Sequence, residues 1–302
     1  MLNGNRKVKI AALSILSNTT LIVLKIVAGL LSGSVSIISE AIHSSMDLLA
    51  ALIAFFSVNF SSKPADDNHP YGHGKIENVS GVIESVLIFV AAVLIIREAI
   101  TKLIHPGGKL VAVPVAVAVM LISAIINTFV SKKLYKVAKE EDSVALEADA
   151  LHLKTDVYTS LGVGLGLLLL QITNIEILDP IVAILVALLI IKESWALCRN
   201  AFNPLLDIKL PEEYEIKINE IMSQYKNEII DYHMLRTRKS GSMKYIDFHM
   251  TVREDLTVKE SHDLSERIEK DLEEHLKNAN VSIHVEPGSH KSEEAVNTSK
   301  EE

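Results

Sequence analysis

The chain has 302 residues, of which 49% are hydrophobic and 23% are charged, and its formal net charge is −8 at pH 7. This length allows two modest domains, and the acidic balance argues against a protein that binds nucleic acid. The single cysteine, Cys198, excludes an internal disulfide.

The charged residues divide the chain into two parts. Residues 1–206 contain 16 Lys and Arg and 16 Asp and Glu, whereas residues 207–302 contain 14 and 22, so the second part accounts for the whole net charge. We therefore predict a membrane domain over residues 1–206, a soluble domain over residues 207–290 and a disordered polar tail over residues 291–302.

Six apolar segments follow one another in the first part, and each approaches or exceeds the roughly 20 residues that a membrane-spanning helix needs. They cover residues 10–31, 36–60, 78–104, 112–134, 144–171 and 178–198. The first follows Arg6, Lys7 and Lys9, as the apolar core of a signal peptide would. It is longer than such a core and no small-residue cleavage motif follows it, so we interpret it as the first span.

Positive residues are unevenly distributed between the connecting segments. The N-terminal tail and the segments 61–77 and 131–143 contain nine Lys and Arg, whereas the region 97–109 contains three. Because positive residues favour the cytoplasmic side, we predict a multi-pass protein of the cell membrane with both termini in the cytoplasm.

The second part has the pattern of a small α+β domain. A helix is expected at 211–225, strands at 231–238 and 244–252, a second helix at 257–276 and a third strand at 281–286. Thr257 and Glu260 have the spacing of a capping box at the start of the second helix. The order α-β-β-α-β predicts a compact two-layer domain.

Two predicted spans each carry a histidine and an aspartate four residues apart: His43 and Asp47 in the second, His152 and Asp156 in the fifth. This spacing places both side chains on one helix face. If the helices adjoin, the four groups can form the tetrahedral shell of two nitrogens and two oxygens that zinc favours. The alternative is a polar helix contact without metal, but ionisable groups at membrane depth are costly, and few other acids are expected there, which favours a metal site.

Two further features accompany this pair of motifs. Glu40 lies three residues before His43 on the same helix face, where it could orient the imidazole or relay protons. The segment between the second and third spans contains Asp66, His69 and His73, which could bind a metal ion. For these three residues a solvated polar loop is the alternative.

Histidines also recur in the C-terminal domain. His249 lies opposite the apolar face of its predicted strand, and His284 and Glu286 share the polar face of the last strand. His233 and His262 lie on neighbouring elements. These residues could bind one or two metal ions, and the alternative is a set of scattered surface histidines.

Taken together, these stretches resemble the cation diffusion facilitator family, and in particular its bacterial zinc and iron efflux type. The resemblance extends over nearly the whole chain. The stretches that carry it are SVSIISEAIHSSMD (34–47), PADDNHPYGHGKIE (64–77), ADALHLKTDV (148–157), PLLDIKLPEE (204–213), HMLRTRKSG (233–241) and IHVEP (283–287).

This resemblance implies six transmembrane helices, a ferredoxin-like or metallochaperone-like cytoplasmic domain and a homodimer. It implies a transport site formed by His43, Asp47, His152 and Asp156. It implies a loop site formed by Asp66, His69 and His73. It implies a binuclear site formed by His233, His249, His262, His284 and Glu286. It also implies a salt-bridge network between Lys75 and Asp207 that joins the membrane halves of the dimer.

The sequence departs from some bacterial relatives at two of these positions. Those relatives have aspartate in place of His43 and of Glu286. The first difference bears on metal selectivity, and the second bears on which side chains bind metal in the C-terminal domain.

We therefore expect an antiporter that exports zinc in exchange for protons by alternating access, because protons and metal compete for the same imidazole and carboxylate groups. No cofactor is expected, and zinc acts as cargo and regulator. The expected partners are membrane lipid, a second copy of the chain, divalent metal ions and protons, but no nucleic acid. Cadmium, cobalt, iron or manganese as main cargo, a channel, and a metal sensor are alternatives. An intramembrane zinc hydrolase is a remote one, since the sequence has no H-E-x-x-H motif.

Overall fold

The computed structural model describes residues 2–32, 35–104, 113–173 and 177–288. Some side chains within the helices, including those of Glu40 and His43, lie outside the described set, and so does the predicted tail over residues 291–302. The chain forms two compact units, Met1–Leu205 and Leu206–Glu302.

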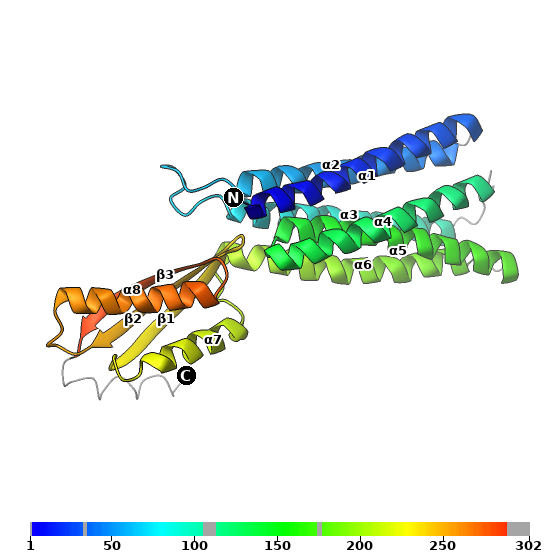
Figure 1. Cartoon of the computed structure of the whole chain (residues 1–302). Helices are drawn as coiled ribbons and strands as arrows, with labels where there is room; N and C mark the ends of the chain where they lie inside the picture. Colours follow the sequence, from blue (N-terminus) through cyan, green and yellow to red (C-terminus); the bar gives the residue numbers. More distant parts are fainter. Residues whose placement is uncertain (1, 33–34, 105–112, 174–176, 289–302) are drawn as a thin grey trace. The chain divides into compact units, whose positions relative to one another are not determined.

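The first unit is a bundle of six long helices (Figure 1). They are α1 (Leu2–Ser32), α2 (Val35–Ser61), α3 (Lys75–Ile104), α4 (Val113–Glu141), α5 (Val144–Thr173) and α6 (Leu178–Phe202). The prediction of six helices is confirmed, and α1 packs along α2, α4 along α5 and α3 along α6. α4 continues beyond the predicted end at residue 134 because Leu134, Val137 and Ala138 prolong its buried stripe.

The bundle exposes apolar side chains on its outer surface and buries polar ones. Within the described residues, three segments are long and apolar enough to cross a bilayer: Arg6–Val27, Lys75–Thr101 and Pro180–Leu206. The large apolar side chains exposed along them include Val23, Phe89, Leu94 and Leu185. The polar side chains buried in the unit include Ser14, Asn18, Asp47, Glu84 and Asp149. Apolar side chains outside and polar ones inside are typical of a helical bundle that crosses a bilayer.

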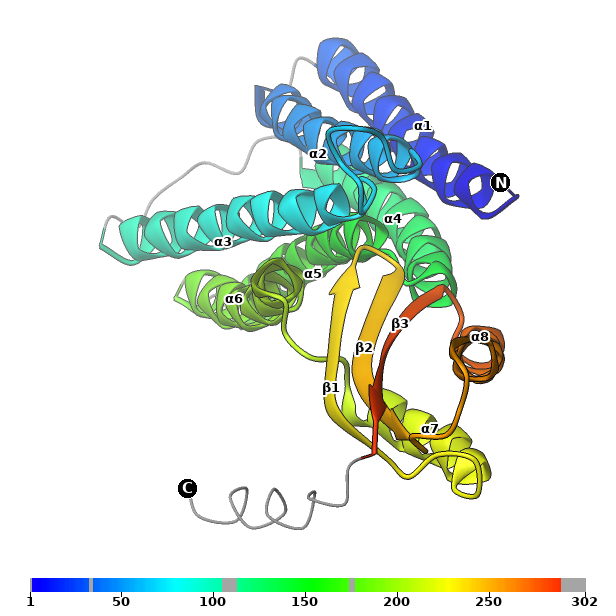
Figure 2. The ribbon, with the colours of Figure 1, turned by 90° about the vertical axis from the view of Figure 1, so that its left-hand side faces the viewer.

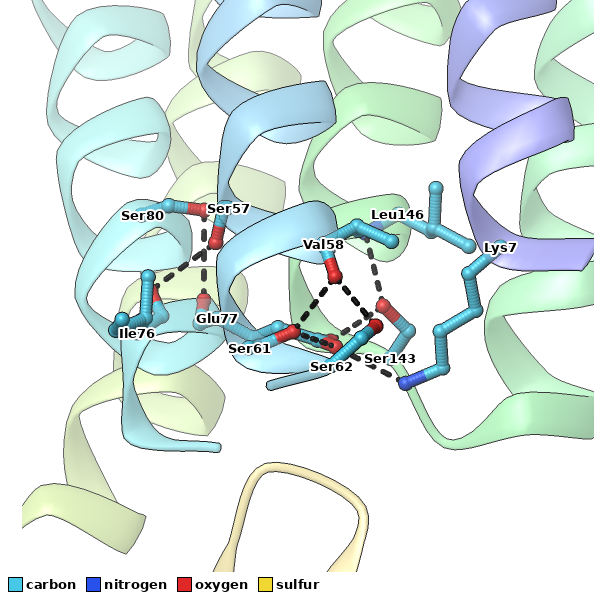
Figure 3. Close-up of polar contacts among 10 residues, drawn as sticks. All are labelled: Lys7, Ser57, Val58, Ser61, Ser62, Ile76, Glu77, Ser80, Ser143 and Leu146. Carbon is cyan, nitrogen blue, oxygen red and sulfur yellow. Dashed lines mark hydrogen bonds and ion pairs between the residues drawn. The ribbon is translucent and has the colours of Figure 1, made fainter. Parts of the chain in front are cut away.

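At one end of the bundle, the carboxylate of Glu77 on α3 joins several elements (Figure 3). Its Oε1 accepts hydrogen bonds from Lys7 Nζ of α1 at 3.0 Å and from Ser61 Oγ of α2 at 2.9 Å. Ser143 Oγ, in the turn before α5, donates to its other oxygen. Lys7 and Glu77 are only 7% and 2% exposed. The Glu77 carboxylate therefore links the end of α2 at Ser61 to the start of α3, which are the two ends of the connecting segment 62–74.

Close packing between α3, α5 and α6 depends on Gly81. A Cβ atom at this position would lie 2.7 Å from Val144 Cγ1 and 3.0 Å from Ala201 Cβ. The absence of a side chain thus lets the three helices approach one another. Asn78, one turn earlier, donates a hydrogen bond to the carbonyl oxygen of Ala201 at 3.3 Å, which further links α3 to α6.

α6 carries both the single tryptophan and the single cysteine of the chain. Trp195 is 69% exposed, and Cys198 is partly buried. Because the two residues are three positions apart on one helix, their side chains lie on the same side of it.

The second unit is an α+β domain with a three-stranded sheet (Figure 2). Its elements are α7 (Glu212–Met222), the 3₁₀ turn η2 (Ser223–Tyr225), β1 (Asp231–Ser240), β2 (Met243–Val252), α8 (Val258–His275) and β3 (Ala279–Pro287). The 3₁₀ turn η1 (Asn203–Leu206) contains the boundary between the two units in the chain. β2 is the central strand, antiparallel to β1 and parallel to β3. The predicted order α-β-β-α-β is confirmed.

Both helices of this domain pack against one face of the sheet. Ile246, Phe248 and Met250 of β2 share a buried core with Ile218 of α7 and Ile268 of α8. Since successive strand residues point to opposite faces, His249 lies on the face that the helices do not cover. The domain is therefore a two-layer structure with one open sheet face.

The start of α8 confirms the predicted capping box. The side chain of Thr257 accepts a hydrogen bond from the backbone N–H of Glu260, and the Glu260 carboxylate accepts one from the backbone N–H of Thr257. This pair satisfies two backbone donors that a helix start otherwise leaves unbonded.

Candidate metal centres

Three groups of histidine and acidic side chains occur in the described part of the chain, each with ligand atoms within 4.8 Å of one another. The groups are Asp47, His152 and Asp156; Asp66, His69 and His73; and His233, His249 and Glu286. We call them the bundle group, the loop group and the sheet group. Every one of these residues is among those that the sequence analysis singled out.

The bundle group lies between α2 and α5. Asp47 is on α2, and His152 and Asp156 lie one turn apart on α5. His152 Nε2 is 3.2 Å from Asp47 Oδ1. Asp47 is buried and the other two are partly buried. The structure thus brings together three of the four predicted transport residues, while the side chains of His43 and Glu40 lie outside the described residues.

Two side chains of α1 support the helix that carries Asp47. Asn18 is buried and donates a hydrogen bond to the backbone carbonyl oxygen of Asp47 at 3.3 Å. Lys25 is also buried, and its Nζ donates to Ser44 Oγ at 2.5 Å. The sequence analysis did not identify either residue, although a lysine inside an apolar span is itself a signal of a functional region.

Two further acids are buried in the same bundle, more than the sequence analysis expected at this depth. Asp149 lies three residues before His152 on α5 and accepts a hydrogen bond from Ser14 Oγ at 3.1 Å. Glu84 lies on α3, seven residues after Glu77 and on the same helix face. That spacing was visible in the sequence and could have identified α3 as a helix with a polar inner face.

The donor atoms of the bundle group suit a divalent cation. An imidazole nitrogen and two carboxylates are ligands that zinc and neighbouring transition metals accept, and tetrahedral zinc would need one more ligand. Two carboxylates also offset the charge of a divalent ion in a medium of low dielectric constant. The arrangement can therefore bind a dication reversibly inside the bundle.

The loop group is organised around the carboxylate of Asp66. Its Oδ1 is 3.1 Å from His69 Nδ1, and its Oδ2 is 3.3 Å from His73 Nε2. The backbone N–H of His69 donates to the same carboxylate at 2.7 Å and is the main cause that lowers the pKa of Asp66. Gly72, with φ of +77°, makes the turn that brings His73 back toward Asp66.

One atom of this loop group is poorly satisfied. Nδ1 of His73 is buried and has no hydrogen-bond partner among the described residues. Asp66 and His69 are exposed. The group is thus an accessible set of one carboxylate and two imidazoles, a composition that fits a divalent transition metal.

The sheet group forms a row across the three strands. His233 of β1 lies opposite His249 of β2, which lies opposite His284 of β3. Glu286 joins the row: its Oε1 is 2.8 Å from His249 Nδ1, and its Oε2 is 3.3 Å from His233 Nε2. The hydrogen bond with His249 is the main cause that lowers the pKa of Glu286. His284 Nε2 is farther away, 3.8 Å from Glu286 Oε1.

His262 does not join this row within the chain. It is exposed on α8, and α8 packs on the sheet face opposite to the histidines.

A β-bulge follows His233, where Met234 has φ of +54°. Bulges redirect side chains near functional sites, and this one shifts the register of β1 directly after the ligand candidate.

The predicted dimer contact involves Lys75 and Asp207, one in each unit. Lys75 is the first residue of α3, and Asp207 follows η1. Within the second unit, Arg238 Nη1 lies 3.6 Å from Asp207 Oδ1. The link between Lys75 and Asp207 stays a prediction.

Comparison with protein-family models matches the chain to two families. Residues 11–206 match the model described as the cation efflux transmembrane domain, and residues 210–288 match the cation efflux protein, cytoplasmic domain. The two matches cover the helical bundle and the α+β domain respectively.

Individual relatives are similar over almost the whole chain. An uncharacterised transporter of Synechocystis is 35% identical, over 92% of this chain and 89% of its own length. The manganese efflux system protein MneP of Bacillus subtilis is 30% identical, over 92% and 95%. The cation-efflux pump FieF of Shewanella oneidensis is 30% identical, over 91% and 92%.

Proposed function

The chain belongs to the cation diffusion facilitator family of cation efflux proteins, and on this premise we propose that it exports zinc from the cytoplasm in exchange for protons. Membership in this family makes the chain a membrane transporter of divalent metal cations rather than an enzyme, as predicted. The preference for zinc and the exchange for protons are the proposal.

The bundle group is the observation that carries the proposal. Its ligand atoms come from two helices, lie inside a bundle with an apolar outer surface and converge within 4.8 Å. Ionisable groups in such an interior mark a pathway for ions. A site made by side chains of two helices can also open and close when these helices move, as alternating access requires.

Zinc is the preferred cargo because of the nitrogen ligands. His152 supplies one imidazole to the bundle group, and His43 is proposed to supply a second from α2. Nitrogen-rich tetrahedral shells favour zinc, whereas manganese accepts more oxygen ligands. Since one relative is named a manganese efflux system protein, manganese is the main alternative cargo, with cadmium, cobalt and iron as others.

Competition between metal and protons for the same ligand atoms would couple zinc export to proton import. The contact between His152 Nε2 and Asp47 Oδ1 uses the lone pairs that a metal ion would need. A proton between these atoms and a metal ion on them are therefore mutually exclusive. Protons that enter from outside would displace the metal outward, and metal from the cytoplasm would displace the protons inward.

The other two groups are proposed to act outside the transport step. The loop group, at the junction of α2 and α3, would bind metal near the entrance to the bundle. The sheet group, with His284, would sense cytoplasmic metal and tighten a homodimer. The distribution of Lys and Arg supports cytoplasmic termini and a cytoplasmic location of both groups.

Zinc flux in proteoliposomes tests the proposal. The purified protein is reconstituted with a zinc indicator and a pH indicator inside the vesicles, and the pH gradient and the metal gradient are imposed separately. We expect zinc movement to drive opposite proton movement, and a pH gradient to drive zinc against its own gradient. Zinc flux without proton movement would indicate a channel, and zinc binding without flux would indicate a sensor.

A further inference from the structure

Glu84 is a buried ionisable group that takes no part in the proposed transport site. It is 1% exposed, and both of its carboxylate oxygens are buried without a hydrogen-bond donor among the described residues. One turn further along α3, Ile88 belongs to an apolar cluster with Ala148 of α5 and Ile190 of α6. The carboxyl group therefore lies at an apolar helix junction, where an ionised carboxylate is costly.

Asp149 of α5 shares this environment. It is 0% exposed, and its charge interacts with that of Glu84. Ser14 donates a hydrogen bond to Oδ1 of Asp149, but its Oδ2 is buried and has no partner among the described residues. Glu84 and Asp149 thus present three buried oxygen atoms that lack a donor.

Among the described residues, Asp149 is the ionisable group that acts on Glu84. α2 and α6 also pack against α3. Among the described residues, no lysine, arginine or histidine donates a hydrogen bond to Glu84. Two like charges in an apolar interior disfavour each other, and one proton relieves this repulsion.

We propose that Glu84 binds a proton while the bundle group is free of metal and releases it when metal binds there. The proton would remove the charge that this apolar junction disfavours, since a protonated carboxyl group is neutral. Asp149 lies one helical turn from His152, a rise of about 4.5 Å. Because charges are only weakly screened in a medium of low dielectric constant, the charge of a dication at the bundle group would stabilise the ionised form of Glu84.

This inference rests on the proposed exchange of metal for protons and adds a proton-binding residue to it. When metal enters, the O–H bond of Glu84 breaks and the proton passes to water on the side from which the metal came. When metal leaves, a proton from the opposite side rebinds to Glu84. The residue would be part of the coupling without being a metal ligand.

Infrared difference spectroscopy of the full-length protein tests Glu84 directly. Spectra at neutral pH before and after addition of zinc are compared for the wild type and for Glu84→Gln. We expect zinc to remove a C=O stretch of a protonated carboxylic acid in the wild type, and this change to be absent in Glu84→Gln. Glu98→Gln, an exposed glutamate on the same helix, is the matched control and should retain the change.

Glu84→Asp keeps a carboxylic acid and should shift the band without abolishing its loss, so it serves as the test if Glu84→Gln does not fold. A band that persists when zinc is bound would show a permanently protonated, structural Glu84. A band change that survives in Glu84→Gln would place the proton elsewhere. Either result overturns the inference.

Proton flux measured on the same preparations distinguishes failure of the proposed exchange from failure of the proposed role of Glu84. If the wild type moves zinc without protons, the proposed exchange fails, whatever the spectra show. If the wild type exchanges zinc for protons, Glu84→Gln should release one proton fewer for each zinc ion bound. An unchanged proton count in a folded Glu84→Gln variant would refute the role of Glu84 alone.

Discussion

At the scale of single residues, the charge balance of the bundle group determines whether it can bind a dication. Asp156→Asn keeps the shape of the side chain and removes one of two negative charges. Loss of partners that merely support a ligand weakens metal affinity about 10- to 100-fold, so loss of a ligand should reduce it by at least about 100-fold. Zinc flux in proteoliposomes should fall accordingly, with the thermal stability unchanged.

Glu98→Gln is a suitable control for this variant, because it also removes one carboxylate but from an exposed position on α3. It should transport like the wild type. Wild-type flux in a folded Asp156→Asn protein would remove Asp156 from the transport site.

The identity of residue 43 should set metal selectivity. His43→Asp replaces a nitrogen ligand with a carboxylate, as in some bacterial relatives, and raises the negative charge of the site. Oxygen-rich shells suit manganese, and a site with fewer nitrogen ligands discriminates less strictly against larger ions such as cadmium. We therefore expect the variant to retain zinc transport and to gain manganese or cadmium transport, measured in parallel and normalised to folded protein. Unchanged ratios between the metals would mean that His43 is not a ligand.

At the scale of secondary-structure elements, the ion pair between Lys7 and Glu77 connects the ends of α1, α2 and α3. Lys7→Met leaves the buried carboxylate of Glu77 without its cation, and breaking a buried pair in this way costs about 3 kcal/mol. The free energy of unfolding in detergent should fall by this amount. The double variant with Glu77→Gln should be more stable than the sum of the single effects suggests, because no charge is then left unpaired.

Arg6 provides the comparison for that ion pair. It lies next to Lys7 and pairs with Glu140 and Glu141, but its side chain is half exposed. Exposed pairs contribute about 0–1 kcal/mol, so Arg6→Met should have little effect. Equal effects of Arg6→Met and Lys7→Met would show that the buried pair does not stabilise the bundle.

The three strands of the C-terminal domain should bind metal through the sheet group. His249 is its central residue: it contacts Glu286, and its ring centroid lies 5.5 Å from that of His233 and 4.7 Å from that of His284. In the full chain with Asp156→Asn, which removes binding at the transport site, His249→Ala should reduce the amount of zinc bound. His275→Ala, an exposed histidine of α8, is the control and should bind zinc like its parent. If both variants bind the same amount of zinc, the sheet group does not bind metal.

The helices and strands were predictable because the sequence patterns that indicate them are local. Apolar segments located all six helices, and the alternation around His249 and the spacing of Thr257 and Glu260 located strands and a helix start. Contacts between distant elements were predictable where paired His and Asp motifs marked them, as in the bundle group, but not elsewhere. The pairing of Lys7 with Glu77 and the burial of Glu84 and Asp149 depend on which helices adjoin, which no local pattern determines.

The same reason explains the position of His262. Its place on a helix was predicted, but whether that helix covers the histidine face or the opposite face of the sheet depends on tertiary packing. Ile268 and Leu272, which are buried in the core of the domain, determine that α8 lies on the face away from His249.

At the scale of the whole molecule, the predicted homodimer depends on Lys75 and Asp207. Asp207 has φ of +54°, a region that asparagine tolerates better than alanine, so Asp207→Asn tests the charge with little added backbone strain. Together with Lys75→Gln, it should reduce the yield of crosslinks between subunits at this level in membranes. Such a loss requires a water-poor network, because an exposed pair contributes only about 0–1 kcal/mol.

Lys209→Ala is the matched control for the dimer contact. Lys209 lies two residues after Asp207 and pairs with Glu215 of the same domain. Its replacement should leave crosslinking unchanged. Wild-type crosslinking in both Lys75→Gln and Asp207→Asn would contradict the predicted contact.

The natural sequence also equips this molecule with its own optical reporter. The sole indole and the sole thiol of the chain, Trp195 and Cys198, lie one turn apart on α6. A dye attached to the thiol would quench or accept the emission of the indole, and brominated lipids would reveal how deeply the indole is immersed. Rearrangements of α6 during a transport cycle could thus be followed in real time in the chain without any substitution.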